Sequence, residues 1–161
     1  MTHALIKVPR FFGHSIFVKL WFFPVWLGLG VAKLAIFMFS FKKLAPWLGT
    51  ADGVVPWLPL IDARQLHRAR LIKQVICLAA RYTPWDSNCF PQAVLARMML
   101  GLYQVPYCLF FGVRRNSQRS LFDAHAWVSA GRVRVIGGES FNDYVVVGMY
   151  VSPQFAKNRG D

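Results

Sequence analysis

An almost unbroken apolar run near the N-terminus, from Ile16 to Phe41, constrains the fold of this chain more than any other feature. Its sequence is IFVKLWFFPVWLGLGVAKLAIFMFSF. About 20 consecutive apolar residues suffice to cross a bilayer, but Lys19 and Lys33 divide this run and Pro24 lies in its uncharged centre. We therefore expect one or two buried or interfacial helices over residues 16–48, broken near Pro24, with a membrane span as the alternative.

The charge of the chain is strongly positive and is concentrated beside this run. The net charge is +12, and residues 1–49 hold six lysines and arginines without any acidic residue. Positive charge next to an apolar helix suits contact with anionic lipid. No helix-turn-helix, zinc-finger or RNP-type pattern is found, so we expect no nucleic-acid partner.

The cysteines exclude two classes of small protein. Cys77, Cys89 and Cys108 are an odd number and include no CxxC pair. A disulfide framework or a zinc site is therefore not expected, and neither is a cofactor. Free thiols fit a reducing compartment, and we expect a cytoplasmic protein, with association with a membrane left open.

The segment DSNCFPQAV, residues 86–94, indicates the start of a helix at Cys89. The three residues before the cysteine are good N-caps, because their side-chain oxygens accept hydrogen bonds from free N–H groups of a first turn. Pro91 is tolerated in that first turn, where its missing donor costs nothing. The helix dipole favours an anion at this end, so the thiolate is stabilised. The position is typical of a nucleophile.

The rest of the chain predicts helices first and strands afterwards. A turn-rich linker is expected at residues 50–60, and a helix over 62–82 with Asp62 as its cap. Segments rich in β-branched and aromatic residues then predict a strand at 105–113, a hairpin at 124–138 and a strand at 144–151. The expected class is α+β, with a cysteine-bearing helix packed on a small antiparallel sheet.

A second residue suited to catalysis follows the cysteine. His125 is the only histidine after residue 67 and lies at the start of a predicted strand. Histidine is the side chain whose unperturbed titration suits a general base near neutral pH. A cysteine at a helix N-terminus and a histidine on a following strand are the arrangement of papain-like and transglutaminase-like enzymes.

A narrower resemblance rests on PWDSNCFPQAVLARMML, on CLFFGVRR, and on AHAWV followed by VIGGE, with FSFKKLAPWLG upstream. At these segments the chain resembles the leader-peptidase (B-type) proteins of lasso peptide biosynthesis, in the transglutaminase-like superfamily. The resemblance covers about residues 10–152. It implies a cysteine peptidase that removes the leader from a ribosomally made precursor peptide, with Cys89 carrying the acyl group and His125 acting as base and then acid.

The same resemblance implies the partners. They are the precursor peptide with its leader, a lasso cyclase that joins the freed amine to an Asp or Glu side chain, and a separate leader-recognition protein. A separate protein is expected because nothing before the hydrophobic helices resembles the recognition domain. Peripheral contact with a membrane is left open.

The third member of a catalytic triad is where the chain departs from the family. The family commonly has an acid on the strand after the histidine, and counting across the predicted hairpin places that acid near Gly137. Glu139 is the nearest acid and Asp143 the next, and a bend at the glycines would let either reach His125. A water molecule or a backbone carbonyl in this role is the alternative.

We therefore predict a hydrophobic, basic helical region and linker at residues 1–60, a transglutaminase-like peptidase core at 61–152 and a tail at 153–161. Two other classes of function stay open. One is a non-catalytic scaffold on the same fold that binds the precursor or a partner. The other is a small basic membrane protein in which Cys89 and His125 never meet.

Overall fold

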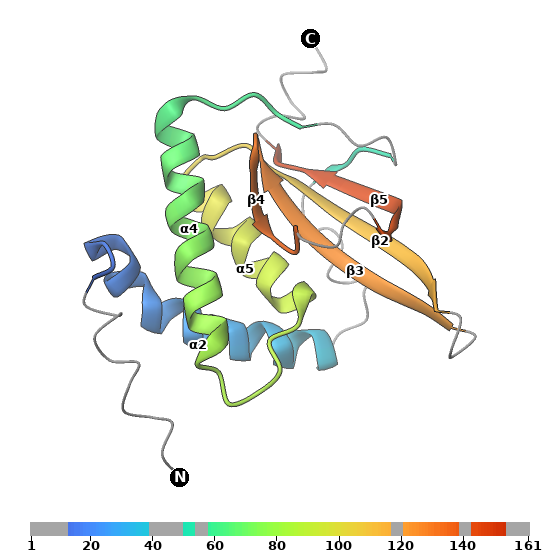
Figure 1. Cartoon of the computed structure of the whole chain (residues 1–161), viewed down its shortest axis with the longest axis horizontal. Coiled ribbons are helices and arrows are strands. Elements are labelled where there is room, and N and C mark those ends of the chain that lie inside the picture. Colours follow the sequence, from blue (N-terminus) through green and yellow to red (C-terminus); the bar gives the residue numbers. More distant parts are fainter. Residues whose placement is uncertain (1–12, 39–49, 54–57, 117–120, 139–142, 154–161) are drawn as a thin grey trace.

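The computed structural model describes residues 13–38, 50–53, 58–116, 121–138 and 143–153. Its helices are α2 (Ile16–Met38), α4 (Ala63–Arg81) and α5 (Cys89–Leu102), and its strands are β1 (Thr50–Ala51), β2 (Cys108–Asn116), β3 (Leu121–Ala130), β4 (Val133–Ile136) and β5 (Val145–Val151). The strands form one antiparallel sheet in the order β1-β5-β2-β3-β4. Helices α4 and α5 pack against this sheet, and α2 crosses both of them (Figure 1). The predicted α+β class is confirmed.

Helix α2 runs through Pro24 without a break, so the predicted interruption was wrong. A proline inside a helix costs about 3 kcal/mol, because it removes one hydrogen bond and crowds the preceding turn. Here Val18 lies buried before the proline, and Val25 and Leu29 lie buried after it. Packing of both halves on the same core keeps the helix continuous, since tertiary contacts outweigh local propensity.

Specific contacts join α2 to the two helices beneath it. A Cβ atom on Gly28 would lie 2.9 Å from Cδ1 of Leu95 in α5, so glycine allows the two helices to approach closely. The Trp21 indole donates to the Tyr103 hydroxyl at 2.7 Å. The Trp26 indole donates to a backbone carbonyl at the end of α4, at 3.0 Å. Helix α2 is therefore part of the folded core.

The opposite side of α2 is apolar and exposed. By length and composition this helix could also cross a membrane. Its exposed large side chains recur every three or four residues along the helix; they are Ile16, Leu20, Phe23, Leu27, Val31, Leu34, Phe37 and Met38. We call them the outer stripe of α2.

The first turn of α4 confirms the predicted cap. Asp62 accepts a hydrogen bond from the backbone N–H of Gln65 at 2.8 Å, and the Gln65 side chain accepts one from the backbone N–H of Asp62 at 3.1 Å. This reciprocal pair is a capping box, which satisfies two N–H groups that a helix start otherwise leaves open.

The strands differ from the sequence prediction at their ends. Strand β2 begins at Cys108, three residues later than expected, and β1 forms within the predicted linker by pairing Thr50 with Val151 of β5. The β3–β4 hairpin turns at Gly131, whose φ of 51° favours glycine. Alternate residues of β3 face opposite sides of the sheet: Ala126 and Val128 join the helical core, while Trp127 joins a second buried cluster.

We predict that Asp62→Ala lowers the free energy of unfolding by about 1 kcal/mol, because it removes the capping bond. Asn88→Ala is the matched control, since Asn88 occupies the N-cap of α5 but its side chain makes no capping bond. Urea unfolding of both variants measures the difference. Equal losses would contradict a specific role for the Asp62 cap.

Candidate active site

Cys89 is the first residue of α5, as the sequence predicts, and is half-buried. None of the expected caps closes this helix end with a capping bond in the structure: the Asn88 side chain makes none, and the Ser87 hydroxyl bonds to that of Thr83 at 2.9 Å instead. The positive end of the helix dipole therefore keeps its capacity to stabilise an anion. A thiolate on Cys89, the first residue of the helix, would lie at this end.

His125 lies within β3, and aromatic side chains hold its ring. The centroid of the imidazole is 4.9 Å from that of Tyr144 and 5.9 Å from that of Trp127. His125 pairs across the sheet with Gly112, where an added Cβ would lie 2.7 Å from the Trp127 ring. The glycine thus makes room for the indole that packs beside the imidazole.

A backbone carbonyl fixes the orientation of the imidazole. Nε2 of His125 lies 2.9 Å from the carbonyl oxygen of Gly137. A carbonyl can only accept a hydrogen bond, so the neutral ring carries its proton on Nε2 and leaves a lone pair on Nδ1. Gly137 is the position at which the sequence leads us to expect an acid.

The two acids named as candidates for this role do not supply it in the described structure. Asp143 is exposed, and its carboxylate lies 3.8 Å from the guanidinium of Arg114, which also lies 3.4 Å from Asp123. Glu139 lies outside the described residues. The group seen to orient His125 is the Gly137 carbonyl.

Helix α5 begins beside the part of β3 that carries His125. Phe90, next to Cys89, has its ring 5.6 Å from that of Phe111, and Phe111 pairs with Ala126 in β3.

The described structure shows no hydrogen bond between the Cys89 thiol and the His125 imidazole. The His125 ring packs on Trp127 and Tyr144, on the face of the sheet opposite the helical core in which Cys89 packs. The structure therefore does not bring the two side chains into contact.

A cavity of about 340 Å³ is lined in part by His125. The other lining residues are Lys73 and Cys77 from α4, Gln92 from the first turn of α5, and residues 134–138 at the end of β4. Cys89 is not among the lining residues, although Gln92 follows it by one helical turn. Cys77 is half-buried and packs against the helical core, and it also lines this cavity.

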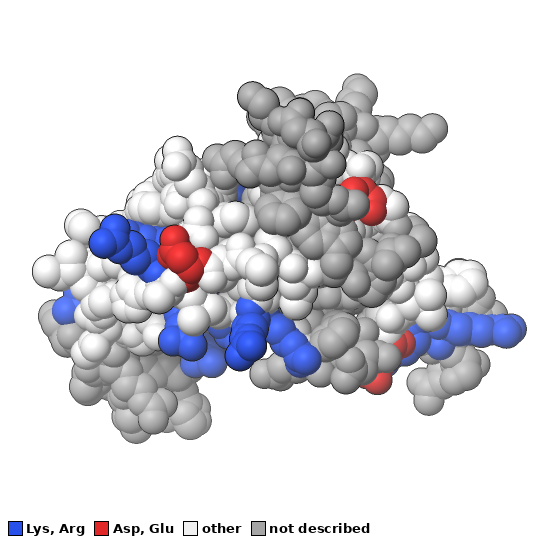
Figure 2. Space-filling model, turned by 90° about the horizontal axis from the view of Figure 1, so that it is seen from above, with Lys and Arg blue, Asp and Glu red and all other residues white. Residues whose placement is uncertain are grey.

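The charge around this cavity is positive. Lys73 and Arg134 line it, and no acidic residue does so among the described residues. Figure 2 shows lysine and arginine side chains in a row along the lower part of the molecule as seen from above, with acidic side chains at only a few places. A peptide with acidic residues would be attracted to such a basic surface.

The third cysteine belongs to the core. Cys108 is fully buried among Phe110, Trp127 and Met149. Burial, with a smaller contribution from Asp52, raises the pKa of the Cys108 thiol to about 12. This thiol therefore stays protonated and unreactive near neutral pH. Within the described ranges, no group of three or more His, Cys, Asp or Glu residues could hold a metal ion.

Comparison with known proteins gives one match. A family model described as "Transglutaminase-like superfamily" matches residues 35–148, from the second half of α2 into β5. The matched region contains both Cys89 and His125. No curated protein and no solved structure matches the chain.

We predict that Gly137→Ala destabilises the protein. Gly137 has a φ of 69°, which costs other residues roughly 1–2 kcal/mol, and an added Cβ would lie 2.6 Å from the Ala126 carbonyl and 3.0 Å from Nε2 of His125. Gly101→Ala is the control: an added Cβ in α5 meets no atom within 4 Å and should stabilise by up to about 1 kcal/mol. Urea unfolding measures both, and a neutral Gly137→Ala would contradict the tight fit.

Proposed function

The chain belongs to the transglutaminase-like superfamily, and we propose that it is a cysteine peptidase that removes the leader from a ribosomally synthesised precursor peptide during lasso peptide maturation. Cys89 is the proposed nucleophile and His125 the proposed base. Superfamily membership supports chemistry of the cysteine-protease kind. The finer assignment to leader removal rests on the sequence resemblance around these two residues.

The observation that carries the proposal is the bond between Nε2 of His125 and the Gly137 carbonyl. It leaves the Nδ1 lone pair as the basic site of the ring. A base whose protonation and orientation are fixed in advance needs no reorganisation when the substrate binds.

The proposed reaction has two stages. The Cys89 sulfur attacks the carbonyl carbon of the scissile bond while Nδ1 of His125 takes the thiol proton, and the imidazolium then protonates the departing amine. A water molecule hydrolyses the resulting thioester, with His125 again accepting and returning a proton. Backbone N–H groups at the start of α5 are the proposed donors to the oxyanion.

A carbonyl differs from a carboxylate in one respect that matters here. It orients the imidazole but brings no full negative charge to stabilise the imidazolium that forms during the reaction. We propose that the carboxylate of Glu139, with Asp143 as its substitute, contributes at most a negative charge that stabilises the imidazolium, and that it does not orient the ring.

The proposed substrate and partners follow from charge and from the resemblance. Lys73 and Arg134 beside His125 would attract an acidic leader segment. We propose that a separate recognition protein delivers the leader and that a lasso cyclase takes the freed peptide, both in the cytoplasm. The outer stripe of α2, with its basic neighbours, is the proposed surface for peripheral contact with an anionic membrane.

A non-catalytic scaffold on the same fold is the second candidate function. The observation that favours it is the absence of a hydrogen bond between the thiol and the imidazole. A third arrangement, with Cys77 as the nucleophile, is suggested by its place in the lining of the His125 cavity. Chemical labelling separates all three.

We predict that iodoacetamide modifies Cys89 faster than the other cysteines, as located by mass spectrometry, and that His125→Ala slows this labelling. The reason is that the proposed base accepts the thiol proton and the helix start favours an anionic sulfur. Cys108 serves as the internal control, because its raised pKa of about 12 keeps it unlabelled in the folded protein. Selective labelling of Cys77 would indicate that Cys77 and not Cys89 is the nucleophile. If no cysteine reacted with iodoacetamide, the result would favour the non-catalytic scaffold.

We also predict that Cys89→Ala abolishes cleavage of the precursor while Cys77→Ala, the matched control, leaves it within about twofold of the wild type. Both changes remove only a sulfur atom from a half-buried side chain, so the fold tolerates either one. Glu139→Gln should reduce turnover far less than His125→Ala. Cleavage retained by Cys89→Ala would end the proposal.

A further inference from the structure

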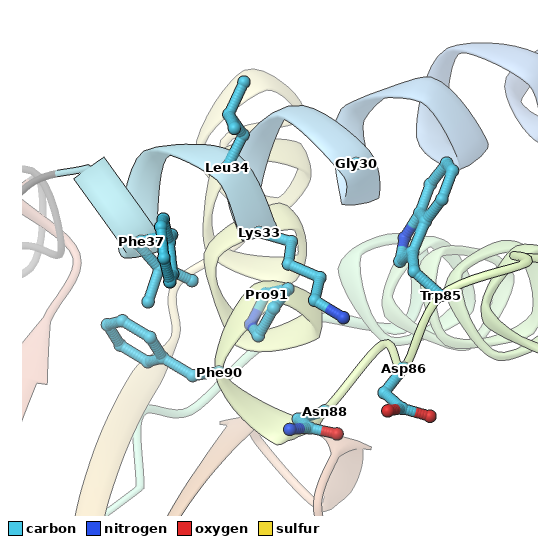
Figure 3. Close-up of a pocket in the computed structure, with 10 residues that line it drawn as sticks. Gly30, Lys33, Leu34, Phe37, Trp85, Asp86, Asn88, Phe90 and Pro91 are labelled. Atoms are coloured by element: carbon cyan, nitrogen blue, oxygen red, sulfur yellow. The ribbon is translucent and has the colours of Figure 1, made fainter.

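A second and larger cavity opens on the other side of the Cys89 helix start. Its volume is about 670 Å³, within the range of about 300–1,000 Å³ typical of ligand sites. Its lining includes Asn88, Phe90 and Pro91, the residues that flank Cys89 in the sequence. Helix α2 forms the facing wall (Figure 3). We call this cavity the α2–α5 pocket.

The walls of the pocket are mostly apolar. Leu34 and Phe37 belong to the outer stripe of α2, and Figure 3 shows their helix facing the Phe90 and Pro91 side chains across the opening. Gly30 allows the Trp85 ring to pack closely against α2, because a Cβ there would lie 2.8 Å from that ring. Apolar walls of this kind bind apolar side chains by removing their surface from water.

A few polar groups line the same pocket. Lys33 and Asp86 bring opposite charges, and Figure 3 shows the Lys33 side chain reaching from α2 toward the segment that carries Asp86 and Asn88. The indole N–H of Trp85 is buried and has no hydrogen-bond partner in the described structure. A donor in this condition costs free energy until it meets an acceptor. A peptide carbonyl is such an acceptor.

We propose that the α2–α5 pocket binds a bulky apolar side chain next to the scissile bond of the peptide substrate. This inference rests on the function proposed above, because it makes the pocket a subsite of the Cys89 nucleophile. Consecutive Cα atoms lie 3.8 Å apart, so residues next to a scissile bond held at Cys89 extend into the nearest cavities. A main-chain carbonyl of the same peptide accepts the Trp85 N–H once the ring turns slightly.

The lining favours a peptide over a lipid chain as the occupant. A hydrocarbon chain offers nothing to Lys33, Asp86 or the Trp85 donor, and it would leave these groups without partners. A peptide brings both parts, an apolar side chain for the walls and main-chain donors and acceptors for the polar groups. Helix α2 then has a function beyond packing and membrane contact, since it supplies one wall of the substrate site.

The test is binding of a defined peptide to the full-length Cys89→Ala protein, followed by nuclear magnetic resonance. The chain has six tryptophans, and Trp85→Phe identifies which indole N–H signal belongs to Trp85. The probes are acetyl-Gly-Phe-Gly-Phe-Gly-amide and its counterpart with alanine in place of both phenylalanines. We expect the first to shift the Trp85 signal saturably and to bind at least about tenfold more tightly than the second, because its phenyl rings are buried.

Helix α2 offers a matched pair of variants. Leu34 and Phe37 line the pocket, whereas Leu20 and Phe23, with the same spacing and similar exposure, lie on the outer stripe away from it. Leu34→Ala with Phe37→Ala should weaken binding of the phenylalanine peptide at least about fivefold. Leu20→Ala with Phe23→Ala should leave it unchanged.

Two results would overturn the inference. The Trp85 signal could fail to respond to the phenylalanine peptide, or both pairs of variants could weaken binding equally, which would indicate unspecific apolar contact of the lipid-binding kind along α2. Because the binding test uses a protein without the Cys89 thiol, its failure leaves the labelling test of the catalytic proposal intact. Conversely, specific binding of the phenylalanine peptide together with an unreactive Cys89 would support peptide binding in the pocket and would contradict the proposed peptidase activity.

Discussion

Burial of helix α5 is the constraint on which the rest of the structure depends. The helix is apolar on most of its surface, and Leu95, Ala96, Met99 and Leu100 are all buried. A helix of this composition must be covered on more than one side. The sheet covers one side and α2 and α4 cover the others, with Gly28 allowing α2 to approach Leu95. Cys89 is half-buried at the N-terminal end of this helix, and the residues next to it in the sequence line the α2–α5 pocket.

The candidate site combines the ends of elements that are far apart in the sequence. Helix α5 brings Cys89, strand β3 brings His125, and the residue after β4 brings the carbonyl that orients the imidazole. A glycine at position 137 reaches this geometry through a φ of 69° and through the absence of a Cβ beside Nε2. A backbone carbonyl thus contacts the ring nitrogen of His125 at the position where the sequence led us to expect an acid.

The sequence pattern predicted features that depend on neighbouring residues in the chain. It failed for features whose formation depends on tertiary contacts. The capping box at Asp62 follows from short-range hydrogen bonding. The start of α5 at Cys89 was predicted from the residue types around it, although the expected capping bond does not form there. The continuity of α2 through Pro24 depends on packing against α4 and α5, which no local pattern contains. Two features became visible only in the structure, because each joins residues some fifty positions apart in the sequence. One is the lining of the α2–α5 pocket, and the other is the shared position of Cys77 and His125 in the lining of the smaller cavity.

The account's central claim is that the Gly137 carbonyl holds the proton of neutral His125 on Nε2 and leaves Nδ1 as the base for Cys89. Nitrogen-15 chemical shifts of the neutral His125 ring measure this most directly. We expect the Nε2–H form, because the Gly137 carbonyl accepts a hydrogen bond from that nitrogen. A neutral ring protonated on Nδ1 would contradict it.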